Sequence, residues 1–199
     1  MKYIIGIDEV GRGPVAGPVS VGIVVLPTLY DISYNFRETG LTDSKKMSPT
    51  ARERVHELAS EIQTKGDIRF GVYSVTAAQI DQRGIEQALR TAIEVGLTKL
   101  AVDFREAEVL LDGRLKAPRE FEQKTIIRGD FLVPAISLAS VVAKVERDAY
   151  MSGAAHAKYP EYGFNTHKGY GTEAHYAALK AHGLTPIHRR SFLRRVVLA

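Results

Sequence analysis

Acidic residues stand at or just beyond the ends of three separate predicted strands in this 199-residue chain. Asp8 and Glu9 end a run that begins at Ile4, Asp112 ends a second run, and Asp130 follows a third. Burying an ionised carboxylate is costly unless a cation lies beside it. The chain has no cysteine, which favours hard ions such as Mg²⁺ or Mn²⁺ over zinc. Four such carboxylates predict a metal site, and a pair of these ions is suited to hydrolysing phosphodiesters.

Each aspartate taken alone has a simpler explanation. Asp at a strand end more often forms a turn or caps a helix, because its side chain bonds to nearby backbone amides. The tandem Asp8-Glu9 is harder to explain in this way, because neighbouring side chains of an extended segment point to opposite faces and one of them becomes buried. In open α/β sheets, ligands bind at the carboxyl ends of the strands, where acids distant in sequence can meet.

The elements that would position these acids follow from hydrophobic periodicity and capping residues. We expect strands at 3–7, 18–26, 68–75, 109–111 and 123–127, and helices at 48–64, 84–95, 134–151 and 173–182. Gly96 is expected to end the second helix. This order predicts an α/β fold with a mixed sheet, helices on its faces and a helical C-terminal region. We expect a single domain over 1–199, in which about 150–199 form a basic helical part.

Charge and hydropathy limit the function classes. The formal net charge is +4, and residues 140–199 carry nine Lys and Arg against four Asp and Glu. This surplus suggests a surface for a polyanion, although a solvated charged face is the alternative. No apolar stretch approaches the ~18 residues of a membrane span, and charge appears too early for a secretory signal. We therefore expect a cytoplasmic protein without a membrane partner.

Several short motifs carry a resemblance to a known family. The segment IDEVGRGP at 7–14 resembles the DExGRGP signature of the type 2 ribonucleases H, or ribonuclease HII, and DSKK at 43–46 is similar to another of its motifs. Further matching blocks occur at 111–113, 129–130, 140–148, 167–172 and 188–192. The resemblance covers nearly the whole chain and is strongest to bacterial members.

The resemblance implies an RNase H-like fold and an endonuclease of the hydrolase class. Such an enzyme cuts the RNA strand of RNA/DNA hybrids and nicks duplex DNA 5′ to a single embedded ribonucleotide, as in ribonucleotide excision repair, leaving 3′-hydroxyl and 5′-phosphate ends. The resemblance assigns catalysis and the binding of two Mg²⁺ or Mn²⁺ ions to Asp8, Glu9, Asp112 and Asp130. By the same analogy, Asp8 bridges both ions. Asp148 is interpreted as structural.

Two segments in the first part of the chain are candidates for substrate binding. Gly11-Arg12-Gly13 would let the backbone approach a nucleic acid closely and offer amides to a phosphate or a 2′-hydroxyl. Lys45 and Lys46 precede a helix N-terminus and would hold a phosphate with it. Ordinary surface lysines are the alternative.

The remaining candidates lie late in the chain. Tyr170 stands between two glycines and would stack on a sugar or base; the resemblance assigns it to the nucleotide after the ribonucleotide, and a loop-anchoring aromatic is the alternative. Arg189 and Arg190 would contact phosphates or pack against the core. The late histidines are expected to be surface or phosphate-contacting residues, namely those at 156, 167, 175, 182 and 188.

Two other function classes remain open at this stage. A junction resolvase on the same fold would share the acids without needing a 2′-hydroxyl, and a non-catalytic nucleic-acid-binding module would need only the basic part. Only seven residues follow Phe192, so a tail that binds a sliding clamp is not expected.

Overall fold

The computed structural model describes residues 2–42 and 44–193. Asp43 of the 43–46 motif lies outside the described residues, as do Arg194, Arg195 and the end of the chain, where no clamp-binding tail is expected. Within the described part, no helix is both long and apolar enough to cross a membrane.

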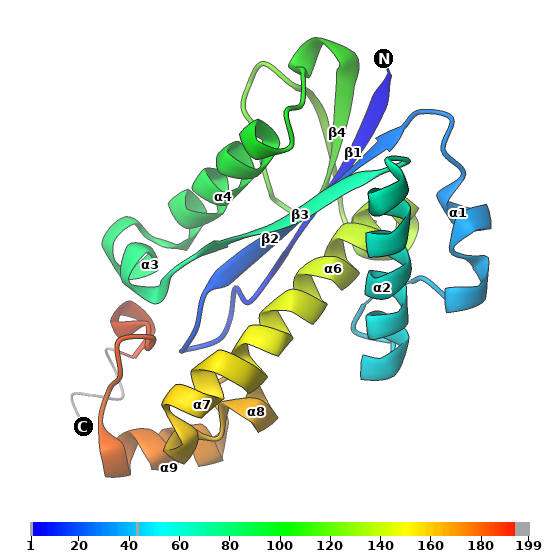
Figure 1. Ribbon diagram of the computed structural model, residues 1–199. Helices are drawn as coiled ribbons and strands as arrows, with labels where there is room; N and C mark the ends of the chain where they lie inside the picture. The colour runs from blue at the N-terminus through cyan, green and yellow to red at the C-terminus, as the bar shows by residue number, and fades with distance from the viewer. Residues whose placement is uncertain (1, 43, 194–199) are drawn as a thin grey trace.

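A mixed five-stranded sheet forms the centre of the fold. Its strands are β1 (Tyr3–Val10), β2 (Val19–Pro27), β3 (Arg69–Val75), β4 (Ala107–Asp112) and β5 (Glu122–Ile126). They are arranged in the order β3-β2-β1-β4-β5 (Figure 1). β2 is antiparallel to both of its neighbours, whereas β1, β4 and β5 run parallel to one another. The expected strands and the mixed sheet are thus confirmed.

β1 is longer than the sequence predicts. Its ladder with β2 pairs Asp8 with Gly22 and continues to the pairing of Val10 with Ser20. Asp8 and Glu9 therefore lie within the strand and not behind its end. Because side chains alternate along a strand, the two carboxylates point to opposite faces of the sheet.

Helices cover both faces of the sheet. The four long ones, α2 (Pro49–Lys65), α4 (Ile85–Lys99), α6 (Pro134–Tyr150) and α9 (Glu173–His182), match the expected helices. Shorter ones are α1 (Ile32–Asn35), α3 (Ala77–Arg83), α5 (Gly129–Leu132), α7 (His156–Lys158) and α8 (Phe164–His167). None of these is among the expected elements, although Thr76 and Gln79 form a capping box at the start of α3.

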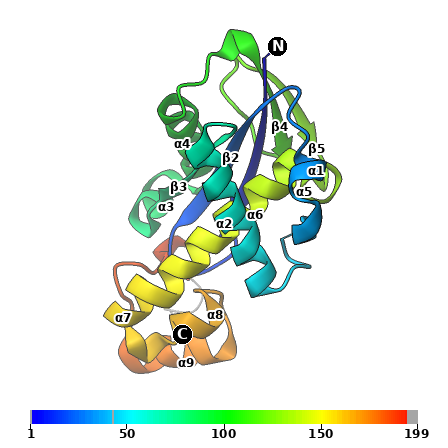
Figure 2. The ribbon, with the colours of Figure 1, turned by 45° about the vertical axis from the view of Figure 1, so that its right-hand side comes forward.

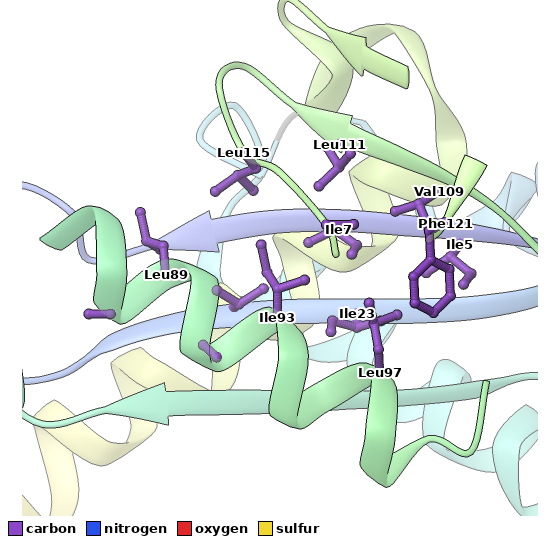
Figure 3. Close-up of a cluster of buried hydrophobic side chains, with 14 of the residues drawn as sticks. Ile5, Ile7, Ile23, Leu89, Ile93, Leu97, Val109, Leu111, Leu115 and Phe121 are labelled. Atoms are coloured by element: carbon purple, nitrogen blue, oxygen red, sulfur yellow. The ribbon is translucent and has the colours of Figure 1, made fainter. Parts of the chain in front are cut away.

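α4 packs on one face of the sheet and continues past Gly96, which was expected to end it. A Cβ on Gly96 would lie 2.5 Å from side-chain carbons of Ile23 and Tyr73. The glycine therefore permits close packing of the helix on the sheet. Figure 3 shows this core, in which one side of α4 meets side chains from β1, β2, β4 and the segment after β4; the labelled residues are Ile5, Ile7, Ile23, Leu89, Ile93, Leu97, Val109, Leu111, Leu115 and Phe121.

α6 crosses the opposite face of the sheet, beside α2 (Figure 2). Its backbone lies very close to the strands, because a Cβ on Gly6 would lie 2.2 Å from the Ala135 carbonyl oxygen and one on Gly22 would lie 2.1 Å from that of Ala139. Two strand glycines thus set the distance between α6 and the sheet. The next residue of α6, Ser140, is brought beside Asp8 by this packing.

We expect Gly6→Ala to lower the free energy of unfolding by about 1–3 kcal/mol, because the added methyl group must push the α6 backbone away from β1. Gly153→Ala is the matched control. Gly153 is exposed and has no atom within 4 Å of its Cβ position, so we expect a change within about 0.5 kcal/mol. Urea unfolding of both variants tests this, and equal midpoints would show that α6 shifts without cost.

The C-terminal helices have a small core of their own. It contains Met151, Tyr162, Phe164 and Leu179, together with Val15 and Ala16 from the loop between β1 and β2. α7, α8 and α9 lie at the end of the sheet that this loop occupies (Figure 1). The loop that carries Gly11-Arg12-Gly13 is therefore held between the sheet and the C-terminal helices.

Candidate active site

Asp8 is the most deeply buried of the four candidate acids, with 5% of its surface exposed. It lies on the face of β1 that α6 covers, where it forms a hydrogen bond with Ser140. Its Oδ1 also accepts the main-chain N–H of Glu9 at 2.8 Å. Glu9 points to the other face, where its Oε1 lies 3.6 Å from Nη1 of Arg12.

Asp112 and Asp130 meet beside β1. Asp112 is the last residue of β4, as expected, and its Oδ1 accepts the main-chain N–H of Asp130 at 3.3 Å. Asp130 does not end a strand; it lies in the first turn of α5, four residues beyond the end of β5. The parallel pairing of Leu111 with Ile7 brings Asp112 to the Asp8-Glu9 pair.

The electrostatics of the site are those of crowded acids. Burial raises the pKa of Asp8 to about 8, the charges of Glu9 and Asp112 add to this, and the hydrogen bond with Ser140 opposes it. Burial also raises the pKa of Glu9, against the opposing charge of Arg12. Burial thus disfavours the ionised forms of Asp8 and Glu9, and the nearby positive charge does not fully offset it.

The donor set fits a hard divalent cation. It consists of carboxylate oxygens that repel one another, and a cation would relieve this repulsion and the cost of burial. In the described part of the chain, however, no three His, Cys, Asp or Glu side chains already form a group that could hold one metal ion.

The described part of the 43–46 motif is anchored beside this site. Ser44 is buried, and its Oγ lies 2.8 Å from Oγ of Ser140, the residue that contacts Asp8. Arg52 of α2 donates to the carbonyl oxygens of Ser44 and Met47. The loop is thus fixed by its main chain and by Ser44.

Lys45 and Lys46 extend from this anchored loop and are exposed. Nζ of Lys45 lies 3.5 Å from Oδ2 of Asp130. Nζ of Lys46 lies 4.5 Å from the ring centroid of Phe131, a cation–π contact. Both ammonium groups therefore lie at the edge of the acidic site, where a phosphate could be bound.

Arg189 does not lie where a phosphate contact requires it. Its side chain is completely buried, and its guanidinium donates to the carbonyl oxygens of Gly11 at 2.6 Å, Arg12 at 3.1 Å and Gly17 at 3.0 Å. This placement contradicts a direct phosphate contact and assigns Arg189 to packing. The loop between β1 and β2 turns these carbonyls inward, and buried carbonyls need donors.

Arg147 of α6 holds the same loop from a second side, although sequence reasoning did not single it out. It donates to the carbonyl oxygens of Pro18 at 3.0 Å, Ala16 at 3.4 Å and Lys168 at 3.2 Å. Burial lowers the pKa of both arginines. The only signal in the sequence is that Arg147 falls within the 140–148 block.

The segment that carries Tyr170 is bound to the same loop. The carbonyl oxygen of Gly169 accepts the main-chain N–H groups of Val15 at 2.9 Å and Ala16 at 3.1 Å. Gly169 has a φ of +86°, and a Cβ there would lie 2.3 Å from the Ala16 oxygen, so glycine is required. The Tyr170 ring is 42% exposed. The structure thus brings Tyr170 to the loop of Gly11-Arg12-Gly13.

Three further candidate residues make polar contacts of different kinds. Arg190 is exposed, and its main-chain N–H donates to Asp81 of α3 at 2.8 Å. Arg12 forms ion pairs with both Glu9 and Glu86. Asp148 forms an ion pair with Lys144 of α6, with 2.9 Å between Nζ and Oδ2, which agrees with a structural role.

The expectation for the histidines is wrong for two of them. His175 and His188 are buried and bond to each other, with 3.0 Å between their Nε2 atoms. They are not surface residues. No local pattern could have revealed this, because the two rings come from α9 and from the segment after it.

Comparisons with known proteins agree with this geometry. The family model described as Ribonuclease HII matches residues 5–195. Ribonuclease HII of Halalkalibacterium halodurans is 41% identical over 191 residues, which are 96% of this chain and 67% of that protein. The solved ribonuclease H2 from Pyrococcus horikoshii OT3 has a TM-score of 0.75 at 26% identity, over 98% and 96% of the two chains. The solved PCNA:RNase HII complex from Archaeoglobus fulgidus has a TM-score of 0.73 at 25% identity, over 98% of this chain and 95% of that chain. The sheet and its flanking helices are thus shared over nearly the full chain.

Proposed function

Because this chain belongs to the ribonuclease HII family, we propose that it nicks duplex DNA 5′ to single embedded ribonucleotides, besides cutting RNA/DNA hybrids. The family cleaves RNA in RNA/DNA hybrids, and the chain is accordingly a ribonuclease H, an endonuclease of the hydrolase class with the RNase H-like fold. The proposed reaction leaves 3′-hydroxyl and 5′-phosphate ends. The observation that carries the proposal is the proximity of Asp8, Glu9 and Asp112, with Asp130 bonded to Asp112, next to a glycine loop of which Gly13 is exposed.

Four residues of the chain form the proposed metal site: Asp8, Glu9, Asp112 and Asp130. Two Mg²⁺ or Mn²⁺ ions bound there would supply activation of water and stabilisation of charge at the scissile phosphate. Ser140 holds the Asp8 carboxylate by a hydrogen bond, and the main chain of Asp130 holds Asp112. These contacts restrain the carboxylates of Asp8 and Asp112 before any substrate is bound.

Substrate reading is proposed for the glycine loop and its neighbours. Gly13 is exposed and has open space around its Cβ position, so a sugar can approach the backbone closely there, where a 2′-hydroxyl can be read. Lys45 and Lys46 would contact a phosphate next to the acids. The Tyr170 ring would stack on the nucleotide that follows the ribonucleotide. Arg189 is omitted from these contacts because it is buried beneath the loop.

A matched set of duplexes tests the proposed function. One sequence is prepared as all-DNA, with one ribonucleotide, and as a continuous RNA/DNA hybrid, and each is incubated with Mg²⁺, with Mn²⁺ or with a chelator. We expect cleavage of the hybrid, a single nick 5′ to the ribonucleotide, and no cutting of all-DNA. End analysis should find a 3′-hydroxyl and a 5′-phosphate.

Three results would contradict the proposal. Ends with a 2′,3′-cyclic phosphate would mean that the 2′-hydroxyl is the nucleophile. Equal cutting of the all-DNA duplex would favour a resolvase-like nuclease, and binding without cleavage under every metal condition would favour a non-catalytic module.

The proposed partners are nucleic acids, and the proposed compartment is the cytoplasm. The solved relative from Archaeoglobus fulgidus is a complex with PCNA. The expectation that no clamp-binding tail follows Phe192 concerns residues 194–199, which lie outside the described residues. A sliding clamp is therefore not part of the proposal.

A further inference from the structure

Three histidine rings are packed together against the segment that carries Tyr170. His175 and His188 are 0% and 2% exposed, and the ring of His167 stacks on that of His175 with 4.4 Å between centroids. In the part of the chain that the structure describes, none of the three forms a hydrogen bond or ion pair with a carboxylate. The cluster is thus buried without a counter-charge.

The hydrogen bonds of the pair determine where its protons lie. Nδ1 of His175 lies 2.8 Å from the carbonyl oxygen of Tyr170, and a carbonyl only accepts, so this nitrogen carries a proton. Nδ1 of His188 accepts the main-chain N–H of Thr185 at 2.9 Å, so this nitrogen carries none. In neutral rings, Nε2 of His188 therefore donates to Nε2 of His175, across the 3.0 Å between them.

A further proton on either ring would break this chain. It would place N–H against N–H, either between the two Nε2 atoms or between His188 and Thr185. The environment opposes this protonation: burial lowers the pKa of His175, and burial together with His175 lowers the pKa of His188 to about 4. The chain of hydrogen bonds is therefore intact at neutral pH.

The described groups around the pair give neither ring a carboxylate partner. The neighbouring rings are those of Tyr162, Phe164 and His167, with His182 beyond Tyr162. The guanidinium groups of Arg147 and Arg189 are buried at adjoining main-chain segments. Asp81 of α3 bonds instead to Arg190 and Ser191. Asp81 lines the same cavity as His188, but its carboxylate already accepts these bonds, so a proton arriving at the pair would meet no carboxylate bonded to either ring.

The main chain of residues 168–170 is held by hydrogen bonds to each of its three carbonyl oxygens. The carbonyl oxygen of Lys168 accepts from Arg147, that of Gly169 from the β1–β2 loop, and that of Tyr170 from both His175 and the N–H of Thr172. The N–H of Gly169 donates to Nδ1 of His167 at 3.2 Å. Lys168 has a φ of +52°, which costs a non-glycine residue about 1 kcal/mol and persists only where such bonds hold it.

We propose that His175 and His188 are positioning residues for Tyr170, because their neutral rings form a directed chain of hydrogen bonds that holds its main chain against the β1–β2 loop. Loss or protonation of the pair releases the main chain of Tyr170, and with it the ring, from its place against the β1–β2 loop. The catalytic consequence rests on the proposed function, in which Tyr170 stacks on the substrate. The positioning itself does not.

A fluorescent reporter measures the positioning without substrate. The chain contains no tryptophan, so Tyr170→Trp introduces a single one at the site. His175→Asn and His175→Ala are made in this background, since Asn can keep the donor to the Tyr170 carbonyl but does not titrate, whereas Ala loses both. His182→Asn, an exposed histidine of the same helix, is the matched control.

We expect the His175→Ala reporter to show higher acrylamide quenching and lower anisotropy than its parent at neutral pH. The parent and the His182→Asn reporter should change in the same way as the pH falls toward about 4, while far-UV circular dichroism stays constant. The His175→Asn reporter should change less than the parent over this range, because the asparagine at 175 does not titrate and only His188 of the pair remains to be protonated. His188→Gln gives a second test if His175→Ala fails to fold, with quenching expected above that of the parent.

With Tyr170 restored, cleavage tests the consequence. We expect His175→Ala to lower kcat/KM at a single ribonucleotide by about tenfold, a moderate loss for a misplaced substrate contact, and to affect a continuous hybrid less. His175→Asn should restore most of this loss. An unchanged reporter in His175→Ala and at low pH would overturn the positioning role. A reporter that responds while cleavage does not would confirm the positioning and count against the proposed stacking by Tyr170.

Discussion

Asp8→Asn is expected to abolish cleavage while the protein remains folded. Asp8 is the most buried of the four acids and lies between Glu9 and Asp112, so an amide at this position removes a central charge of the proposed metal site. Loss of a residue that merely supports a metal ligand costs about 10- to 100-fold, and loss of a ligand should cost more. We expect a decrease of more than about 10²-fold in Mg²⁺, measured on the single-ribonucleotide duplex.

Asp67→Asn is the matched control, because Asp67 is an exposed aspartate outside the site. It should cleave like the parent. If Asp8→Asn retained a tenth or more of the parent activity while circular dichroism showed an intact fold, the assignment of Asp8 as a metal ligand would have to be abandoned.

The same substitution should change how the metal-free protein responds to pH. Folded Asp8 keeps its proton up to about pH 8, whereas the unfolded residue loses it near its ordinary value of 3.8. Between these values the folded state binds more protons, so raising the pH destabilises the metal-free fold. In chelator, Asp8→Asn should therefore gain thermal stability over the parent near pH 8, and this gain should shrink toward about pH 4. A constant difference across this range would contradict the pKa shift.

Arg189→Lys is expected to have the largest effect outside the acids. The buried guanidinium satisfies three carbonyl oxygens of the β1–β2 loop, and a lysine ammonium cannot reach all three. A buried acceptor without a partner costs about 1–3 kcal/mol, so we expect a loss of about 3 kcal/mol or more in the free energy of unfolding. Urea unfolding measures this. Provided that circular dichroism shows the variant folded, its cleavage at a single embedded ribonucleotide should fall by about 10²-fold, because the loop loses its position.

Arg190→Lys provides the comparison on the neighbouring residue. Arg190 is exposed and bonds to Asp81 through its main-chain N–H, so we expect a stability change within about 0.5 kcal/mol. If Arg189→Lys were equally mild in stability and weakened substrate binding only, Arg189 would contact phosphate after all and the buried arrangement would be wrong.

The sequence by itself determined the elements and the chemistry of the acids. Strands and long helices come from local periodicity and capping, which act over a few residues and are present in the chain itself. The expected strands and the four long helices are confirmed for this reason. The absence of cysteine and the residue types at 8, 9, 112 and 130 favoured hard cations for the proposed site, and the motifs led to the family.

Element ends were less well determined, because long-range pairing and packing decide them. β1 extends through Asp8 and Glu9 since β2 offers a partner for each residue up to Val10. α4 continues past Gly96 since the helix needs a glycine where it meets Ile23 and Tyr73. A glycine that permits close approach and one that ends a helix look the same in the sequence.

Only the tertiary structure decided what the polar residues of the C-terminal part do. Arg189 and Arg190 are neighbours of the same type, yet one is buried under the β1–β2 loop and the other is exposed. His175 and His188 likewise form a buried pair that no spacing indicates. Their roles depend on carbonyl groups and rings from segments distant in the chain, and burial depends on those contacts. These long-range contacts cannot be inferred from the residues next to each site in the sequence.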